Sequence, residues 1–205
     1  LGEEFARRRL APGDDLFSNL LHGTLDGEPL CEEDLRGYGV NYLLGGTETT
    51  RNLLGQSMRV LLEHPDQMAR FVRGEVATAT MIDELLRFVT PVMHHSRWVT
   101  ADVEVGGQQM HKGDRATLWM VSANRDEAVF DDPESLDIGR SPNHHVALGG
   151  GGPHYCLGSH LAKLEAVATL DALRPRLERC SFAGRPERVR SNFINGMKHL
   201  PIAVA

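Results

Sequence analysis

The segment HVALGGGGPHYCLGSH, residues 145–160, constrains this 205-residue chain more than any other stretch of its sequence. It sets four consecutive glycines and a proline just ahead of a lone cysteine, Cys156. Glycine loses more conformational freedom on folding than any other residue, so ordering residues 149–152 is unfavourable unless something must approach the backbone closely. The segment therefore predicts a loop against which a ligand lies.

Cys156 stands at or near the first residue of the last predicted helix, residues 157–174. Unpaired N–H groups and the helix dipole at such a position favour an anion, so we expect the thiol to ionise readily and to serve as a metal ligand. Glycines without Cβ atoms let a flat ligand rest on the loop and let N–H groups point toward the sulfur. The alternative is a buried free cysteine beside a flexible loop.

Two other kinds of site fit the spacing less well. A phosphate-binding loop needs a lysine directly after its last glycine, but the lysine here is Lys163, far down the helix. Structural zinc sites usually use closely spaced pairs of thiolates, which this sequence lacks. A zinc-binding interaction module stays open as a hypothesis only if the purified protein carries zinc; its ligands would come from His154, Cys156 and His160 with His144 or His145.

Composition narrows the possible partners and location. With 41% hydrophobic and 24% charged residues the chain has the balance of a soluble globular protein. A net charge of -6 and no basic cluster beyond ARRRL argue against a nucleic-acid partner. No apolar run approaches the length of a membrane span, and three widely spaced cysteines without a C-x-x-C pair favour the reducing cytoplasm. The chain begins at a leucine and reads as though a helix were already under way, so we expect a fragment.

Hydrophobic periodicity predicts a mainly α (α+β) fold. A proline-free helix is expected over about 32–64 and a second over about 78–88, ending before Pro91. Residues 96–121 alternate around GG and KGD, which indicates antiparallel strands joined by turns. An irregular meander rich in Asp, Asn and Pro follows over about 122–145, and weak strands return near 180–205.

The long helix contains the segment LLGGTETTRN in its interior. Two glycines there cost about 1 kcal/mol each relative to alanine, so they suggest a local widening or a close ligand. Thr49 stands four residues after Gly45, so its hydroxyl could donate a hydrogen bond to the Gly45 carbonyl and bend the helix. With Glu48 beside it, this hydroxyl would suit a proton relay. The alternative is a helix crossing that tolerates glycine, with Glu48 in solvent.

Glu84 and Arg87 in DELLR are three residues apart on one helical face, which is the spacing of an ion pair. Most such pairs lie on the surface and contribute little to stability.

Taken in order, these stretches resemble a cytochrome P450 of the soluble bacterial kind. The family's helix motif A/G-G-x-D/E-T-T is matched by GGTETT at 45–50, and its E-x-x-R motif by Glu84 and Arg87. The arginine that ends its meander is matched by Arg140 in ESLDIGR. Its haem loop, F-G-x-G-x-H-x-C-x-G, is matched by Gly150, Gly152, His154, Cys156 and Gly158.

The resemblance implies roles for these residues. Cys156 would be the axial thiolate ligand of haem b iron, and Thr49 with Glu48 would organise proton delivery to bound dioxygen. His154 and Arg97 would bind the haem propionates. Further haem contacts would come from Gly46, Gly150, Gly152, Leu157, Gly158 and Ala162.

The resemblance also implies support and substrate positions. Glu84, Arg87 and Arg140 would form a buried network rather than a catalytic set. Substrate would face Asn41, Leu44, Val92, Met93 and Ile194.

The implied activity is a monooxygenase that inserts one atom of O₂ into an apolar steroid, terpene or fatty acyl substrate. Electrons would come from NAD(P)H through a ferredoxin and its reductase. The alternative is a truncated P450 fragment, haem-binding or not, without turnover.

Three features depart from the family pattern. The phenylalanine expected seven residues before the cysteine is absent, because Gly149 stands there and Leu148 precedes it, and the loop holds one extra glycine. The usual aromatic of the meander is Leu136. The resemblance covers nearly the whole chain but corresponds only to the C-terminal portion of a single P450 domain.

Overall fold

The computed structural model describes residues 1–205 and divides them into two compact units, Leu1–Glu48 and Thr49–Ala205. Helix α3 (Glu32–Glu63) contributes its first half to one unit and its second half to the other. None of the helices combines the length and the apolar composition needed to cross a bilayer.

The first unit is a small helical cluster. It contains α1 (Gly2–Leu10), α2 (Leu16–Leu21) and the antiparallel ribbon of β1 (Thr24–Leu25) with β2 (Glu28–Pro29). Asp15 caps α2, because its carboxylate accepts hydrogen bonds from the Phe17 and Ser18 N–H groups at 3.1 and 3.2 Å. The core of this unit consists of Phe5, Leu20 and Leu35.

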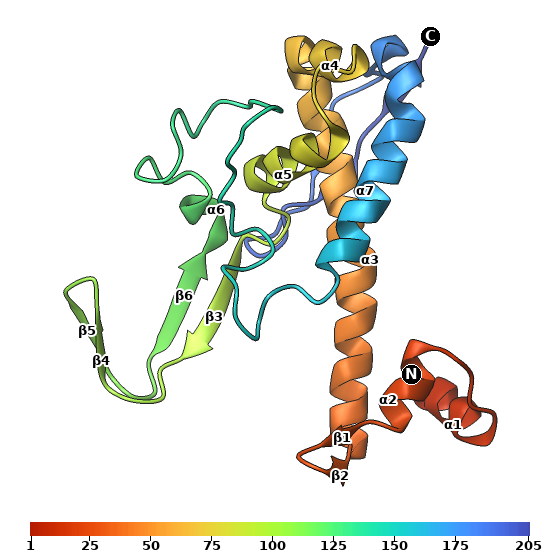
Figure 1. Cartoon of the computed structure of the whole chain (residues 1–205), viewed down its shortest axis with the longest axis vertical. Helices are drawn as coiled ribbons and strands as arrows, with labels where there is room; N and C mark the ends of the chain where they lie inside the picture. Colours follow the sequence, from red (N-terminus) through yellow and green to blue (C-terminus); the bar gives the residue numbers. More distant parts are fainter. The chain divides into compact units, whose positions relative to one another are not determined.

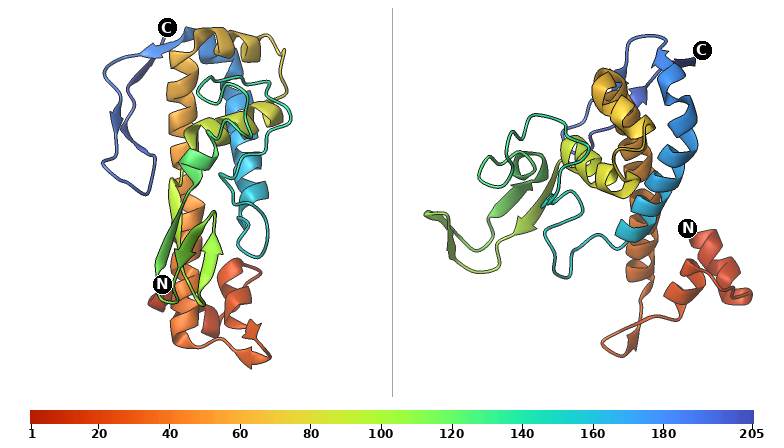
Figure 2. Two further views of the ribbon diagram at one scale, coloured as in Figure 1. Left: turned by 90° about the vertical axis from the view of Figure 1, so that its left-hand side faces the viewer. Right: turned by 45° about the horizontal axis from the view of Figure 1, so that its top comes forward.

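The helices of the second unit enclose the main core. They are α4 (Pro65–Val72), α5 (Thr78–Val89), the short α6 (Met120–Ala123), α7 (Ser159–Leu173) and a 3-10 helix, η1 (Arg174–Arg179). In the different views α7 lies beside the second half of α3 (Figures 1 and 2). The fully buried core side chains include Val60, Leu61, Phe71, Met81, Leu85, Ile138, Ala166 and Leu170.

The end of α5 is fixed by an unusual residue. Thr90 adopts a left-handed conformation with φ of 46°, which side chains with a branched Cβ rarely take. Its hydroxyl donates to the Arg87 carbonyl at 2.7 Å and accepts from the Asn124 amide at 2.9 Å. These bonds hold the turn, and Pro91 then prevents the helix from continuing.

The strands form two-stranded antiparallel ribbons, so the mainly helical fold with small antiparallel sheets is confirmed. In the second unit β3 (His94–Trp98) pairs with β6 (Arg115–Trp119), and β4 (Val103–Val105) pairs with β5 (Gln108–Met110) through a turn at Gly106 and Gly107. Near the C-terminus β7 (Cys180–Phe182) pairs with β10 (Ile202–Val204), and β8 (Glu187–Arg188) with β9 (Met197–His199).

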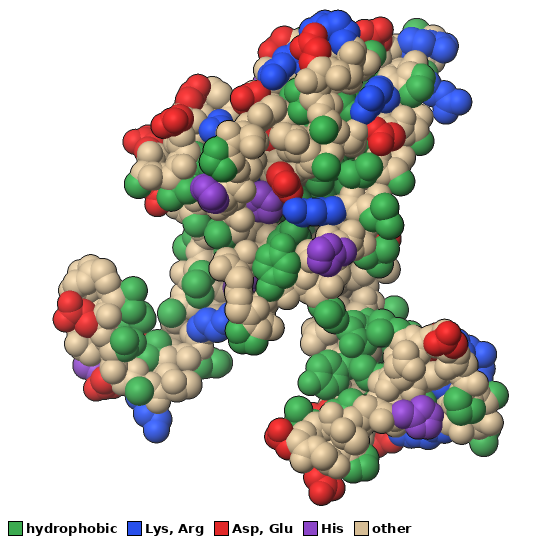
Figure 3. All heavy atoms as spheres, viewed as in Figure 1, with side chains coloured by type: hydrophobic (Ala, Val, Ile, Leu, Met, Phe, Trp, Pro, Cys, Tyr) green, Lys and Arg blue, Asp and Glu red, His purple; other side chains and the backbone are tan.

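Helix α7 begins slightly later than predicted. It begins at Ser159, after a turn in which the Ser159 N–H donates to the Cys156 carbonyl at 3.2 Å, so Cys156 precedes the helix. Leu161 and Leu164 of α7 are 59% and 65% exposed, and Leu157 just before the helix is 81% exposed. Hydrophobic side chains accordingly reach the surface over α7 (Figure 3). The buried face is made instead by small and later residues: Ser159, Ala166 and Leu170.

This arrangement predicts opposite outcomes for two leucines of one helix. Leu170→Ala opens a cavity in the core and should lower the free energy of unfolding by about 2–5 kcal/mol. Leu164→Ala removes a side chain that is 65% exposed and should leave the free energy of unfolding nearly unchanged. Urea unfolding of the 205-residue chain measures both, and equal effects would contradict the assignment of the buried face.

Candidate functional site

The cysteine loop is closed by its own backbone. The Cys156 N–H donates to the Leu148 carbonyl at 2.9 Å, and the Gly149 N–H donates to the Val146 carbonyl at 2.9 Å. Gly149, Gly151 and Gly152 have φ of 95°, 100° and 75°, a region that other residues rarely adopt. The glycines are thus required by the turn itself, a reason that the sequence pattern alone does not reveal.

Leu148 directly precedes Gly149, which stands where the family pattern has a phenylalanine. The Leu148 side chain packs against the main core, and its carbonyl accepts the hydrogen bond from the cysteine N–H. The turn therefore closes without a phenylalanine at position 149.

The surroundings of Cys156 suit an apolar, flat group. The thiol is free and half-buried. A Cβ on Gly158 would meet no atom within 4 Å, so the backbone just after the cysteine is open to a ligand. Leu157 and Leu161 lie exposed on the following turn and would be covered by such a group. The residues present therefore fit a haem bound through sulfur.

No three His, Cys, Asp or Glu side chains of the chain lie close enough to share a metal ion, and this includes the histidines considered for zinc.

Behind this loop, α5 carries a buried ion pair. The Arg87 guanidinium donates two hydrogen bonds of 2.8 Å to the Glu84 carboxylate, and both side chains are fully buried. Arg87 also donates to three meander carbonyls, which gives it as many hydrogen bonds as it has N–H groups. These acceptors are Asn124, Pro133 and Ser135 at 2.8–3.0 Å.

Glu84 binds the far end of the meander. Its carboxylate lies 3.2 Å from the Arg140 Nε, so the structure brings together the three residues predicted for this network. It also accepts from the Asp137 N–H at 3.1 Å and from the Asn143 amide at 3.0 Å. Glu84 and Arg87, which are one helical turn apart on α5, thus hold both ends of the meander.

Two asparagines of the network were not predicted. Asn124 is fully buried, and its side chain joins Thr90 to the loop. The side-chain amide donates to the Thr90 hydroxyl, and the side-chain oxygen Oδ1 accepts from the Val146 N–H at 2.7 Å. Asn143 joins Glu84 to the residues that precede the loop. Their partners lie 22–59 positions away in the sequence, and no local motif marks such contacts.

A second polar group ties the loop to two helices. Asp83 on α5 lies 2.7 Å from the Lys163 Nζ on α7 and 3.5 Å from the Nε2 atom of His145. The hydrogen bond with His145, followed by the one with Lys163, lowers the pKa of Asp83. The carboxylate is therefore charged at neutral pH and links α5, the loop and α7.

The GGTETT segment is helical throughout within α3. Within it the Thr47 hydroxyl donates to the Leu43 carbonyl at 2.6 Å. A Cβ on Gly45 or Gly46 would meet no atom within 4 Å, so packing inside the chain does not require either glycine. The first unit of the chain also holds other predicted site residues: Asn41, Leu44, Gly46 and Glu48.

The segment after α5 meets the turn near Ile194. Val92 forms an antiparallel bridge with Ile194, and the Met93 N–H donates to the Phe193 carbonyl at 2.8 Å. The structure thus brings together the three predicted substrate positions of the second unit although about a hundred residues separate them.

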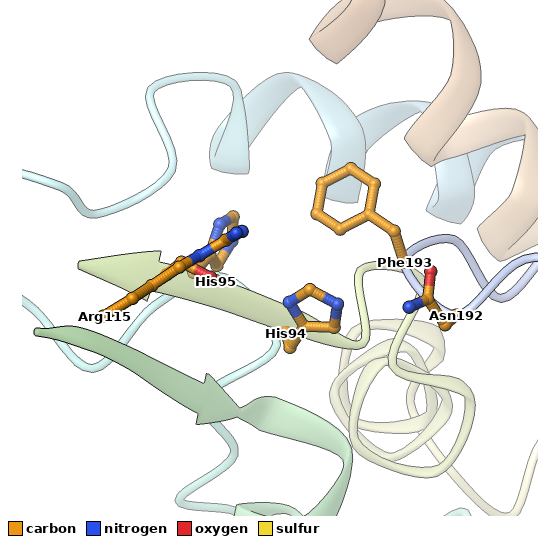
Figure 4. Close-up of a pocket in the computed structure, with 6 residues that line it drawn as sticks. His94, His95, Arg115, Asn192 and Phe193 are labelled. Carbon is orange, nitrogen blue, oxygen red and sulfur yellow. The ribbon is translucent and has the colours of Figure 1, made fainter. Parts of the chain in front are cut away.

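Next to this contact lies an open cavity of about 380 Å³ that the sequence did not predict. Burial lowers the pKa of His95, which lines the cavity, and electrostatic interactions with Arg97, His94 and His154 lower that pKa further. Arg97 and His154, the two residues predicted to bind the propionates, therefore both interact electrostatically with His95. Arg97 otherwise donates to the Ser96 carbonyl at 2.9 Å. The cavity is lined by His94, His95, Ser96, Arg115, Asn192 and Phe193 (Figure 4).

Known proteins share this architecture. The chain is 38% identical over 196 residues to the methyl-branched lipid omega-hydroxylase of Mycobacterium tuberculosis, covering 95% of the chain and 46% of that protein. It is 36% identical to the linalool 8-monooxygenase of Pseudomonas putida, with coverage of 98% and 50%. The structure of CYP109E1 from Bacillus megaterium in complex with testosterone matches with a TM-score of 0.86 and 35% identity, covering 98% of this chain and 56% of that one.

These matches identify the family and show how much of its relatives' length the chain covers. The chain spans about half the length of the relatives it matches. The family profile described as Cytochrome P450 matches residues 7–183, which hold the cysteine loop, the buried ion pair and the meander. The chain therefore belongs to the cytochrome P450 family.

Proposed function

We propose that the chain is the C-terminal portion of a single P450 domain and supplies the haem-thiolate side of a monooxygenase. The observation that carries this proposal is the free, half-buried Cys156, held by a backbone turn that Asn124 connects to the buried Glu84–Arg87 pair. A thiolate in such a turn could serve as a ligand of haem iron.

The proposed contacts with haem b fall into three groups. Cys156 would ligate the iron, while Arg97 and His154 would bind the propionates by charge-assisted hydrogen bonds. Close backbone or side-chain contacts would come from Gly46, Gly150, Gly152, Leu157, Gly158 and Ala162. Bound haem supplies reductive activation of O₂, in which one oxygen atom enters a C–H bond and the other leaves as water.

The protein's own part in that chemistry would be proton supply and substrate placement. The Thr49 hydroxyl would hold a proton at the oxygen site, and the Glu48 carboxyl would replace it. Substrate would lie against the Val92, Met93 and Ile194 contact, with Asn41 and Leu44 as further neighbours. Glu84, Arg87 and Arg140 would position the loop without touching substrate.

The substrate class follows from the relatives. A methyl-branched lipid, linalool and a steroid occur in their names, so we infer an apolar lipid, terpene or steroid that becomes hydroxylated. Electrons would come from NAD(P)H through a ferredoxin and its reductase in the cytoplasm.

A second candidate is a fragment that binds haem weakly or not at all and has no turnover. The exposed leucines of α7 and the half-length coverage of the relatives favour it. Haem retention by the purified chain separates the two proposals.

Replacing the proposed ligand tests the site. Cys156→Ala should abolish the low-spin thiolate signal of the ferric haem complex in electron paramagnetic resonance, because no other sulfur lies in the loop. Cys180→Ala, which removes another half-buried free thiol, should leave that signal intact. Far-ultraviolet circular dichroism should show unchanged helix content in both variants. A thiolate signal that survives in Cys156→Ala would assign the ligand elsewhere.

The support role of the buried ion pair is tested by comparing two Glu–Arg pairs with the same i, i+3 spacing. Glu84→Gln leaves the Arg87 charge uncompensated in the core and should lower the free energy of unfolding by about 3–5 kcal/mol. Glu4→Gln disrupts solvent-accessible pairs with Arg7 and Arg8 and should change it by less than about 1 kcal/mol. Urea unfolding reports both values. If Glu84→Gln unfolds like wild type, the network does not hold the meander.

A further inference from the structure

The cavity beside the predicted substrate contact has a composition unlike that of an ordinary apolar substrate pocket. Four of its six lining residues carry basic or amide side chains, His94, His95, Arg115 and Asn192, and no acidic residue lines it. In Figure 4 the side chains of His94, His95 and Arg115 lie beside β3, while Asn192 and the Phe193 ring lie next to each other on a separate segment. This is an electropositive cavity with one apolar wall.

Two of these groups lack partners inside the chain. The Nδ1 atom of His94 is buried and has no hydrogen-bond partner, although the ring contacts Trp119 in a tilted and Phe193 in an edge-to-face arrangement, with centroid distances of 4.7 and 5.5 Å. Arg115 is exposed and forms no ion pair with a carboxylate of the chain. A buried polar atom without a partner is unfavourable, so the cavity is better satisfied by a polar ligand than by an apolar one.

The electrostatics of the rim agree with this geometry. The same positive neighbours that lower the pKa of His95 would attract an anion, because they disfavour an added proton and favour a negative charge.

We propose that this cavity binds the carboxylate of an apolar acid. The guanidinium of Arg115 presents parallel N–H groups that match a planar carboxylate, and His95 and Asn192 supply further donors. The ring of Phe193 packs against the first methylene groups. The volume of about 380 Å³ holds more than a carboxylate alone, so part of the apolar chain enters with it.

This assignment rests on the proposed function where it treats the acid as substrate, and it then narrows the substrate class to apolar carboxylic acids. A carboxylate here has two possible sources, the substrate or a haem propionate, since Arg97 and His154 also act on His95. The variants below distinguish them.

The test compares octanoate with its neutral counterpart 1-octanol, titrated into the 205-residue chain without haem. Histidine ring signals in ¹³C–¹H NMR spectra, with His95 identified by His95→Gln, report binding at the cavity. We expect octanoate, and not octanol, to shift the His95 signal. Arg115→Gln should weaken octanoate binding about fivefold to tenfold, as expected for a lost charge-assisted hydrogen bond, and leave octanol unaffected. Arg185→Gln, which removes another exposed arginine, is the matched control.

Three results decide between the alternatives. Equal binding of octanoate and octanol, or an unchanged octanoate affinity in Arg115→Gln, overturns the site. If Arg115→Gln instead lowers haem affinity and leaves octanoate binding unchanged, the cavity serves a propionate and the substrate assignment is wrong. If no variant retains haem but octanoate binding still depends on Arg115, the proposed function fails while the carboxylate site stands.

Discussion

The buried pair of Glu84 and Arg87 is the interaction on which the arrangement of the second unit depends. Removing two charges from water is unfavourable, and a buried ion pair is often no more stabilising than a well-packed apolar pair. Here the pair has a positional effect, because its remaining hydrogen-bonding groups contact meander residues from Asn124 to Asn143. The irregular meander acquires a defined path from two residues of one helical turn.

That path leads to the cysteine in few steps. Asn124, whose carbonyl is held by Arg87, binds the Val146 N–H, and the Val146 carbonyl accepts from Gly149. The next closure is the bond from the Cys156 N–H to the Leu148 carbonyl. The position of the thiol is thus set by a chain of buried hydrogen bonds that begins at α5. Loss of the ion pair would release the meander first and the loop with it.

Features encoded by neighbouring residues could be predicted from the sequence. The absence of proline over 32–64 gives α3, Pro91 ends the segment of α5, and the GG turn gives the β4–β5 ribbon. The sequence did not indicate which face of α7 is buried, because periodicity identifies an apolar face but does not say what covers it. Asn124, Asn143 and the cavity could not be predicted, since they depend on strand register and on contacts between distant segments.

The proposed haem-thiolate site is tested most directly by the absorption spectrum of the haem-reconstituted chain after reduction with dithionite and exposure to carbon monoxide. A thiolate opposite carbon monoxide shifts the Soret band to the long wavelength that gives the family its name. We predict this band for the chain in which the loop of Cys156 is intact. A carbon monoxide complex with the shorter-wavelength band typical of a histidine-ligated or unligated haem would contradict the assignment of Cys156 as the ligand.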